Sequence, residues 1–132
     1  MVDGWDSGED ELAVFERDEA LIHDLCRRLL ERMSDTAYLL VTMGSKGLLH
    51  ASKDGKDSPI QIKHYEVPDK DTKVLNATGA GDTLTGAFIH SRLQGAPMET
   101  AIVNGMKAAA LSVACADHAV SPLLSDIASH KR

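Results

Sequence analysis

A short glycine-rich segment, residues 76–82, has the sequence Asn-Ala-Thr-Gly-Ala-Gly-Asp. Gly79 and Gly81 let the backbone turn tightly, and apolar residues at helical spacing follow the segment. The pattern predicts a loop leading into a helix, where the first N–H groups lack partners and the helix dipole is positive. Backbone amides of Ala80, Gly81 and Asp82 at such a position suit a phosphate group or a developing anion.

Asp82 is the candidate for proton transfer. In phosphoryl transfer the protein mainly positions the reactants and stabilises charge, while one carboxylate accepts the proton of the attacking alcohol. The alternative is that Asp82 only caps a helix, because Asp is favoured near helix starts for structural reasons. Two other phosphate motifs are excluded by spacing: no G-x-x-x-x-G-K-[S/T] string occurs, and Gly86 follows Gly81 at the wrong distance for a dinucleotide fingerprint.

The elements before this loop must position it. We predict a helix over residues 19–33, capped by Asp18, because apolar residues recur on one face that we expect to be core, namely Ile22, Leu25, Cys26, Leu29 and Met33. The apolar run 37–43 predicts a parallel strand covered on both faces. Short strands are predicted at 48–51 and 60–64.

Two polar or glycine-containing turns separate these strands. The turn at 53–59 contains lysines that we expect to be solvated. Gly44 to Gly47 is either a functional glycine turn or an ordinary hairpin turn, since glycine supplies the positive φ that such turns need.

Further along, Pro97 predicts a helix start. The helix that follows has a flank of small residues, which suits either close helix packing or a flat adenine ring: Ala101, Gly105, Ala108, Ala109 and Ser112.

Composition limits the class of protein. The 132 residues are 43% hydrophobic and 26% charged, with a formal net charge of −6. The acidic balance and few aromatics argue against nucleic-acid binding, and the sequence lacks an apolar run long enough to span a membrane, so we expect a cytoplasmic location. Cys26 and Cys115 are expected to be buried and reduced. No histidine pair has the spacing that seats zinc on a helix.

The motif at 78–82 and two further segments resemble the carboxyl-terminal part of the ribokinase-like, or PfkB, carbohydrate and nucleoside kinases. Residues 78–82 fit the family signature D-T-x-G-A-G-D, from which Asn76 and Ala77 depart. Residues 39–47 resemble the family's strand and glycine turn beneath the nucleotide, and residues 101–113 resemble its small-residue helix beside adenine. The resemblance implies an α/β fold of the three-layer αβα kind, of which this chain is the nucleotide-binding portion.

The resemblance also implies roles for individual residues. Asp82 would be the catalytic base, and Gly79, Ala80 and Gly81 would form the anion hole. The ATP site would include Thr42, Gly44, Gly47, Thr78, Asn104 and Met106. For Asn104 and Met106 the alternative is a solvent-facing or core position. Mg²⁺ would arrive on the ATP phosphates without dedicated protein ligands. Potassium activation is left open, because Asn76 replaces the Asp that helps hold the cation in many members.

The expected function is ATP-dependent phosphotransfer to a hydroxyl of a sugar or nucleoside. The Asn76-containing motif, with residues 104–112, is most similar to the pseudouridine kinase branch. We expect residues 1–17 to be mobile and residues 18–132 to form the ATP-binding part, with the substrate-binding N-terminal half missing. The alternatives are a noncatalytic nucleotide-binding module without an acceptor site and a structural domain that binds no nucleotide. We leave open whether the chain forms a homodimer.

Overall fold

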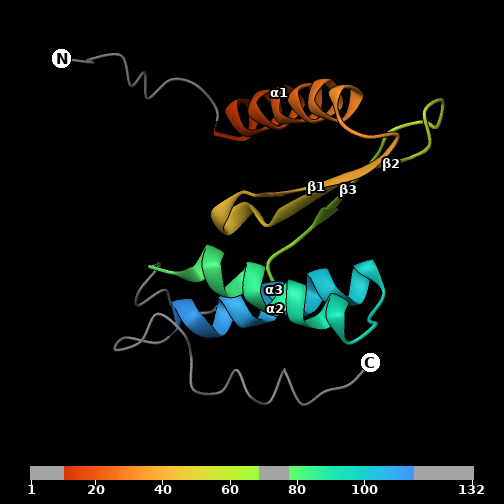
Figure 1. Cartoon of the computed structure of the whole chain (residues 1–132). Coiled ribbons are helices and arrows are strands. Elements are labelled where there is room, and N and C mark those ends of the chain that lie inside the picture. The colour runs from red at the N-terminus through yellow and green to blue at the C-terminus, as the bar shows by residue number, and fades with distance from the viewer. Residues whose placement is uncertain (1–10, 69–77, 115–132) are drawn as a thin grey trace. The chain divides into compact units, whose positions relative to one another are not determined.

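The computed structural model describes residues 11–68 and 78–114, with side chains from residue 18 onward (Figure 1). The described residues form two compact units. The first contains helix α1 and strands β1, β2 and β3, and the second contains helices α2 and α3 together with the turn Gly44–Gly47. None of the described helices is long and apolar enough to cross a membrane.

Helix α1 spans Glu11–Arg32 and lies along one face of the sheet (Figure 1). It begins well before residue 19, so the predicted cap at Asp18 was wrong: this residue lies inside the helix. The predicted core face was also partly wrong. The row that packs on the sheet is Ile22, Cys26 and Leu30, which repeat every four residues. The side chains of Leu25, Leu29 and Met33 are 48%, 53% and 43% exposed.

The sheet is an antiparallel meander of β1 (Thr36–Thr42), β2 (Leu48–Asp54) and β3 (Gln61–Tyr65). Its register places Leu40 opposite His50, and His50 opposite Lys63. Within the described strands, the prediction that residues 37–43 form a parallel strand was therefore wrong. The reason is the connection, because the five residues 43–47 between β1 and β2 can join antiparallel neighbours, whereas a parallel pair needs a crossover of a dozen or more residues.

The connection between β1 and β2 is the glycine turn that the sequence singled out. Gly44 and Gly47 have φ angles of 57° and 92°, and residues Gly44–Lys46 form a single 3₁₀ turn. The amide of Gly47 donates a hydrogen bond of 3.1 Å to the carbonyl of Gly44. Both positive φ angles favour glycine, which confirms the reading of this segment as a turn between two strands.

The core of the first unit lies between α1 and the sheet. Cys26, Leu30 and Ala51 are buried there, and the partly buried residues packed around them include Ala37, Leu39, Val41, Ile60 and Ile62. Burial raises the pKa of the Cys26 thiol, which keeps it protonated and unreactive at neutral pH. This confirms the expectation for Cys26, while Cys115 lies outside the described residues.

Lys53 differs from the expectation of a solvated loop lysine. It lies in β2 and is only 9% exposed. Its ammonium group donates a long hydrogen bond of 3.5 Å to the carbonyl of Met33, just beyond the end of α1. The carbonyl end of a helix attracts cations, so Lys53 joins the sheet to this end of α1.

The second unit is an antiparallel helix pair, α2 (Ala80–Leu93) and α3 (Met98–Val113). Gly95, at φ 86°, makes the tight connection, and Pro97 is the N-cap of α3, as the sequence predicts within one residue. The small flank of α3 is buried against its neighbours, with Ala101, Gly105, Ala108 and Ser112 all inaccessible or nearly so. The two helices therefore approach closely where side chains are small.

Candidate functional site

The candidate site is the turn that starts α2. Gly79 is the N-cap and has φ 79° and ψ 2°, in the left-handed region that favours glycine. No side chain among the described residues caps the helix through this position. The sequence prediction that the glycine segment leads directly into a helix is confirmed, since α2 begins at Ala80.

Two threonine hydroxyls hold the backbone of this turn. The Gly79 carbonyl accepts hydrogen bonds of 2.9 Å from both the amide and the hydroxyl of Thr83. The hydroxyl of Thr85 donates to the Gly81 carbonyl at 3.0 Å. Both hydroxyls bind backbone carbonyl groups, so they do not occupy the first amides of α2. Those amides have no acceptor within the helix, as at every helix start.

The open side of the turn carries the chemistry. A Cβ atom added to Gly81 would meet no heavy atom within 4 Å, so the described residues leave space over this position. Asp82 is exposed and lies in the first turn of α2, where the helix dipole favours negative charge. The turn can therefore present amides to an anion and a carboxylate to a hydroxyl within one helical turn.

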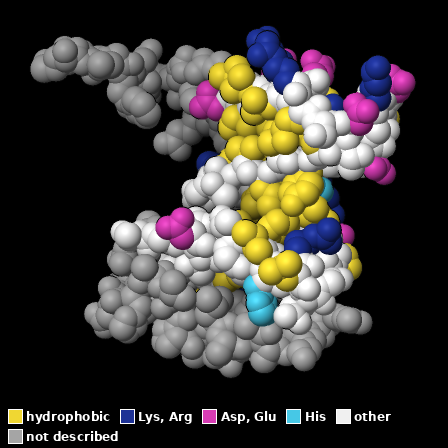
Figure 2. Space-filling model, in the orientation of Figure 1, with side chains coloured by type: hydrophobic (Ala, Val, Ile, Leu, Met, Phe, Trp, Pro, Cys, Tyr) yellow, Lys and Arg dark blue, Asp and Glu magenta, His cyan; other side chains and the backbone are white. Residues whose placement is uncertain are grey.

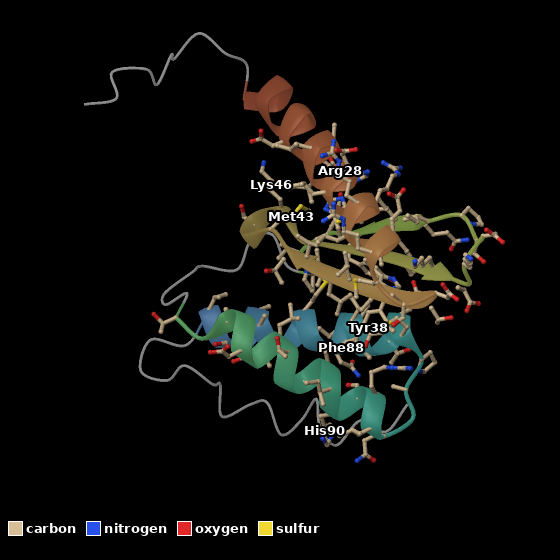
Figure 3. The ribbon with its side chains drawn as sticks, turned by 45° about the horizontal axis from the view of Figure 1, so that its top comes forward. Arg28, Tyr38, Met43, Lys46, Phe88 and His90 are labelled. Atoms are coloured by element: carbon tan, nitrogen blue, oxygen red, sulfur yellow. The ribbon has the colours of Figure 1, made fainter. Side chains whose placement is uncertain are left out.

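Helix α3 supports the start of α2. A Cβ atom on Gly105 would lie 2.9 Å from the Leu84 carbonyl oxygen and 3.5 Å from the Phe88 Cβ. Phe88 is buried, whereas His90 is exposed on the other side of α2 (Figure 3). The close approach at Gly105 positions α2 two residues after Asp82.

Asn104 and Met106 have defined places on α3. The Asn104 amide nitrogen donates a hydrogen bond of 3.1 Å to the Ser91 hydroxyl on α2, and Met106 is 7% exposed in the helix pair. The structure therefore shows the packing role that the sequence left open for Met106. Their contact with a nucleotide base stays a prediction.

The remaining predicted residues divide between the two units. Thr78 and Gly79 precede α2, and the turn Gly44–Gly47 belongs to the same unit. Gly47 is buried and Gly44 is exposed. Thr42 is the exposed last residue of β1 and belongs to the first unit.

No group of three or more His, Cys, Asp or Glu residues that could hold a metal ion occurs in the described part of the chain. Asn76, on which the question of potassium depends, lies outside that part. Three residues that contribute to the site were not predicted from the sequence, namely Thr83, Thr85 and Ser91. A Thr in the first turn, four residues after a glycine carbonyl, is the local signal for such a bond.

Comparison with known proteins gives the family context of this geometry. Residues 8–123 match a family model described as pfkB family carbohydrate kinase. The ribokinase of Dictyostelium discoideum is 30% identical over 91 residues, which are 68% of this chain and 27% of that protein. The bifunctional protein HldE of Nitrobacter hamburgensis is 34% identical over 106 residues, 80% of this chain and 20% of that protein. The chain thus spans a small part of the length of these relatives.

Solved structures show the predicted α/β fold. The ribokinase of Thermotoga maritima matches with a TM-score of 0.63 at 27% identity, over 80% of this chain and 33% of that one. The ribokinase of Cryptococcus neoformans, solved with ADP, matches in fold with a TM-score of 0.66 at 21% identity, over 91% and 37% of the two chains. The adenosine kinase of Schistosoma mansoni, solved with 2-fluoroadenosine, matches with a TM-score of 0.57 at 26% identity, over 74% and 29%.

Proposed function

Because the chain belongs to the pfkB family of carbohydrate kinases, we propose that it supplies the ATP site and catalytic base for phosphoryl transfer to a hydroxyl of a sugar or nucleoside. The observation that carries this proposal is the glycine turn at Gly79, which opens α2 and places Asp82 in its first turn. The ADP complex of the Cryptococcus ribokinase supports an adenine nucleotide as the cofactor.

In the proposed reaction Asp82 accepts the proton of the attacking hydroxyl, whose oxygen forms a bond to the γ-phosphorus of ATP as the bond to the β–γ bridging oxygen breaks. The amides of Ala80, Gly81 and Asp82 face the transferring group and stabilise its charge. The other residues proposed for the ATP site are Thr42, Gly44, Gly47, Thr78, Asn104 and Met106. Mg²⁺ would accompany the ATP phosphates and neutralise part of their charge.

The acceptor is the less specific part of the proposal. The similar proteins include two ribokinases and an adenosine kinase, so both a free sugar and a nucleoside are supported as acceptor classes. Within the second class we propose pseudouridine as the first compound to assay, on the motif around Asn76 alone.

Titration calorimetry of the chain with Mg-ATP tests the nucleotide site. Gly81→Val places a branched side chain in the open space over the turn, where no described protein atom would obstruct it, and should abolish ATP binding. Gly86→Val is the matched control, because it places the same side chain in equally open space farther along α2. Equal ATP affinity in all three proteins would contradict the assignment of the turn.

Asp82→Asn tests the base. In a kinase-competent protein this variant should lose nearly all turnover while its ATP affinity changes little, since the proton acceptor is lost but the amides remain. Turnover within about tenfold of the unchanged protein would contradict the role, because general-base catalysis contributes at least about a hundredfold.

A noncatalytic nucleotide-binding module is the second candidate. This candidate keeps the glycine turn at Gly79 but has no acceptor site. ATP binding by the chain without phosphate transfer to ribose or pseudouridine would support this candidate, whereas transfer by the chain itself would reject it.

A further inference from the structure

Helix α1 carries a second apolar row beside the one that packs on the sheet. Leu21, Leu25 and Leu29 repeat every four residues and are 57%, 48% and 53% exposed. We call these three side chains the leucine row. Hydrophobic side chains gather over α1 among charged ones in the space-filling view (Figure 2). Leucines aligned and half exposed along one side of a helix are typical of an interaction surface, whereas single exposed leucines are ordinary.

We propose that the leucine row docks against the same row of a second copy of this chain, with the two α1 helices antiparallel about a twofold axis at Leu25. The spacing of the row is symmetric about this residue, since Leu21 precedes it and Leu29 follows it by one helical turn each. A twofold axis would therefore bring Leu25 against Leu25, and Leu21 against Leu29 of the second copy. Self-complementary spacing is what an isologous interface requires.

The charges that extend the row are complementary in this same register. Asp18 precedes Leu25 by seven residues and Arg32 follows it by seven, so both lie about two helical turns from the axis, on the side of the row. Both are exposed. The antiparallel arrangement would place each Asp18 opposite Arg32 of the other copy, which gives two equivalent ion pairs between opposite charges. A parallel arrangement would instead place like charges together, and this selects the antiparallel one.

The neighbouring charges do not oppose this arrangement. Arg28 lies on α1 (Figure 3), at the edge of the row. It forms an ion pair of 2.9 Å with Asp24 of the same helix. Glu31 is exposed on a different side of α1, so it would not face the second copy. One helix pair gives an interface at the small end of the range, below about 1,200 Å², so we expect a weak dimer whose population rises with concentration.

Sedimentation equilibrium of the whole chain, over a concentration series that reaches the millimolar range, tests the dimer. Leu25→Glu should shift the mass to that of the monomer, because two carboxylates would meet on the axis. Leu93→Glu is the matched control, since Leu93 is an 80% exposed leucine of α2 and lies outside the row. Far-ultraviolet circular dichroism checks that all variants remain helical.

Charge reversal tests the register. Asp18→Arg and Arg32→Asp should each weaken the dimer roughly three- to tenfold, because two attractive pairs become repulsive ones. The double variant restores opposite charges and should return the dissociation constant to within about twofold of the unchanged protein. Glu31→Arg, with the same change of charge as Asp18→Arg, should leave it unchanged.

Three results would overturn the proposal. A chain that is monomeric throughout the series would mean that the leucine row does not mediate self-association. A dimer that survives Leu25→Glu would place the interface elsewhere. A double variant as weak as the single ones would exclude the antiparallel register.

Discussion

Gly105→Ala on α3 and Gly86→Ala on α2 each add one methyl group to the second unit. We expect them to have opposite effects on its stability. At Gly105 the new Cβ would lie 2.9 Å from the Leu84 carbonyl oxygen, closer than real Cβ contacts, and 3.4 Å from the Leu84 Cγ. At Gly86 it would meet nothing within 4 Å. Because the closest atom at Gly105 belongs to the backbone, relief requires α2 and α3 to move apart.

The magnitudes follow from two terms. Replacing glycine by alanine inside a helix is favourable by about 0.8–1.0 kcal/mol, and this term applies at both positions. Inserting a methyl group into a packed contact is unfavourable by about 1–3 kcal/mol, and this term applies only at Gly105. Gly86→Ala should therefore stabilise the unit by about 1 kcal/mol, whereas Gly105→Ala should destabilise it by up to about 2 kcal/mol.

Urea denaturation followed by far-ultraviolet circular dichroism measures the difference. Both substitutions lie in the second unit, so the two variants report on the same packing even if the two units unfold separately. The midpoint should rise for Gly86→Ala and fall for Gly105→Ala, with the slope unchanged in both. If Gly105→Ala were as stable as Gly86→Ala, α2 and α3 could not approach as closely as the 2.9 Å between the added Cβ and the Leu84 carbonyl oxygen implies. In that case α3 would not position the start of α2.

Three further changes probe the two units. Thr83→Val removes a hydroxyl bond to the Gly79 carbonyl and should weaken ATP binding roughly two- to tenfold in calorimetry, whereas Thr83→Ser should retain it; equal affinities would exclude a positioning role. Lys53→Met keeps the buried stem and should lower the free energy of unfolding by about 0.5–1.5 kcal/mol, less than Lys53→Ala, which also loses packing; the reverse order in urea denaturation would contradict this account. Burial, with the charge of Lys63, lowers the pKa of His50 below 6.5, so the unfolded chain binds this proton first. Stability should therefore be fully present above pH 6.5 and decline as the pH falls toward the folded-state pKa, and His50→Gln should flatten that decline in denaturation curves across this range.

Much of the candidate site could be predicted from the sequence because it depends on neighbours along the chain. Glycine favours a positive φ for steric reasons, and the structure shows such angles at Gly44, Gly47 and Gly79. Apolar residues at helical spacing after the glycine segment likewise predicted α2, with Asp82 in its first turn. The hydroxyl bonds of Thr83 and Thr85 were missed, although they too are local, because Ser and Thr adopt several hydrogen-bonding patterns near a helix start.

Apart from the cap at Asp18, the misassignments concern partners that are distant in sequence. An apolar run indicates that residues 37–43 are covered, but it does not say which strand pairs with them or in which direction. Helix α1 has two apolar rows about 100° apart, and only packing against the sheet decides that Cys26 and Leu30 are buried while the leucine row is exposed. The sequence predicted Lys53 in a solvated loop, whereas in the structure β2 places it beside the end of α1.

The sequence by itself thus determined the family, the turn chemistry and the helical frame of the glycine segment, since these depend on residue type and short spacing. Tertiary structure decided the direction of strand pairing, the face of α1 that is buried and the contact of Asn104 with Ser91. The physical reason is that hydrophobic burial is non-directional: it selects which side chains leave water, while the geometry of whole elements selects which of them meet.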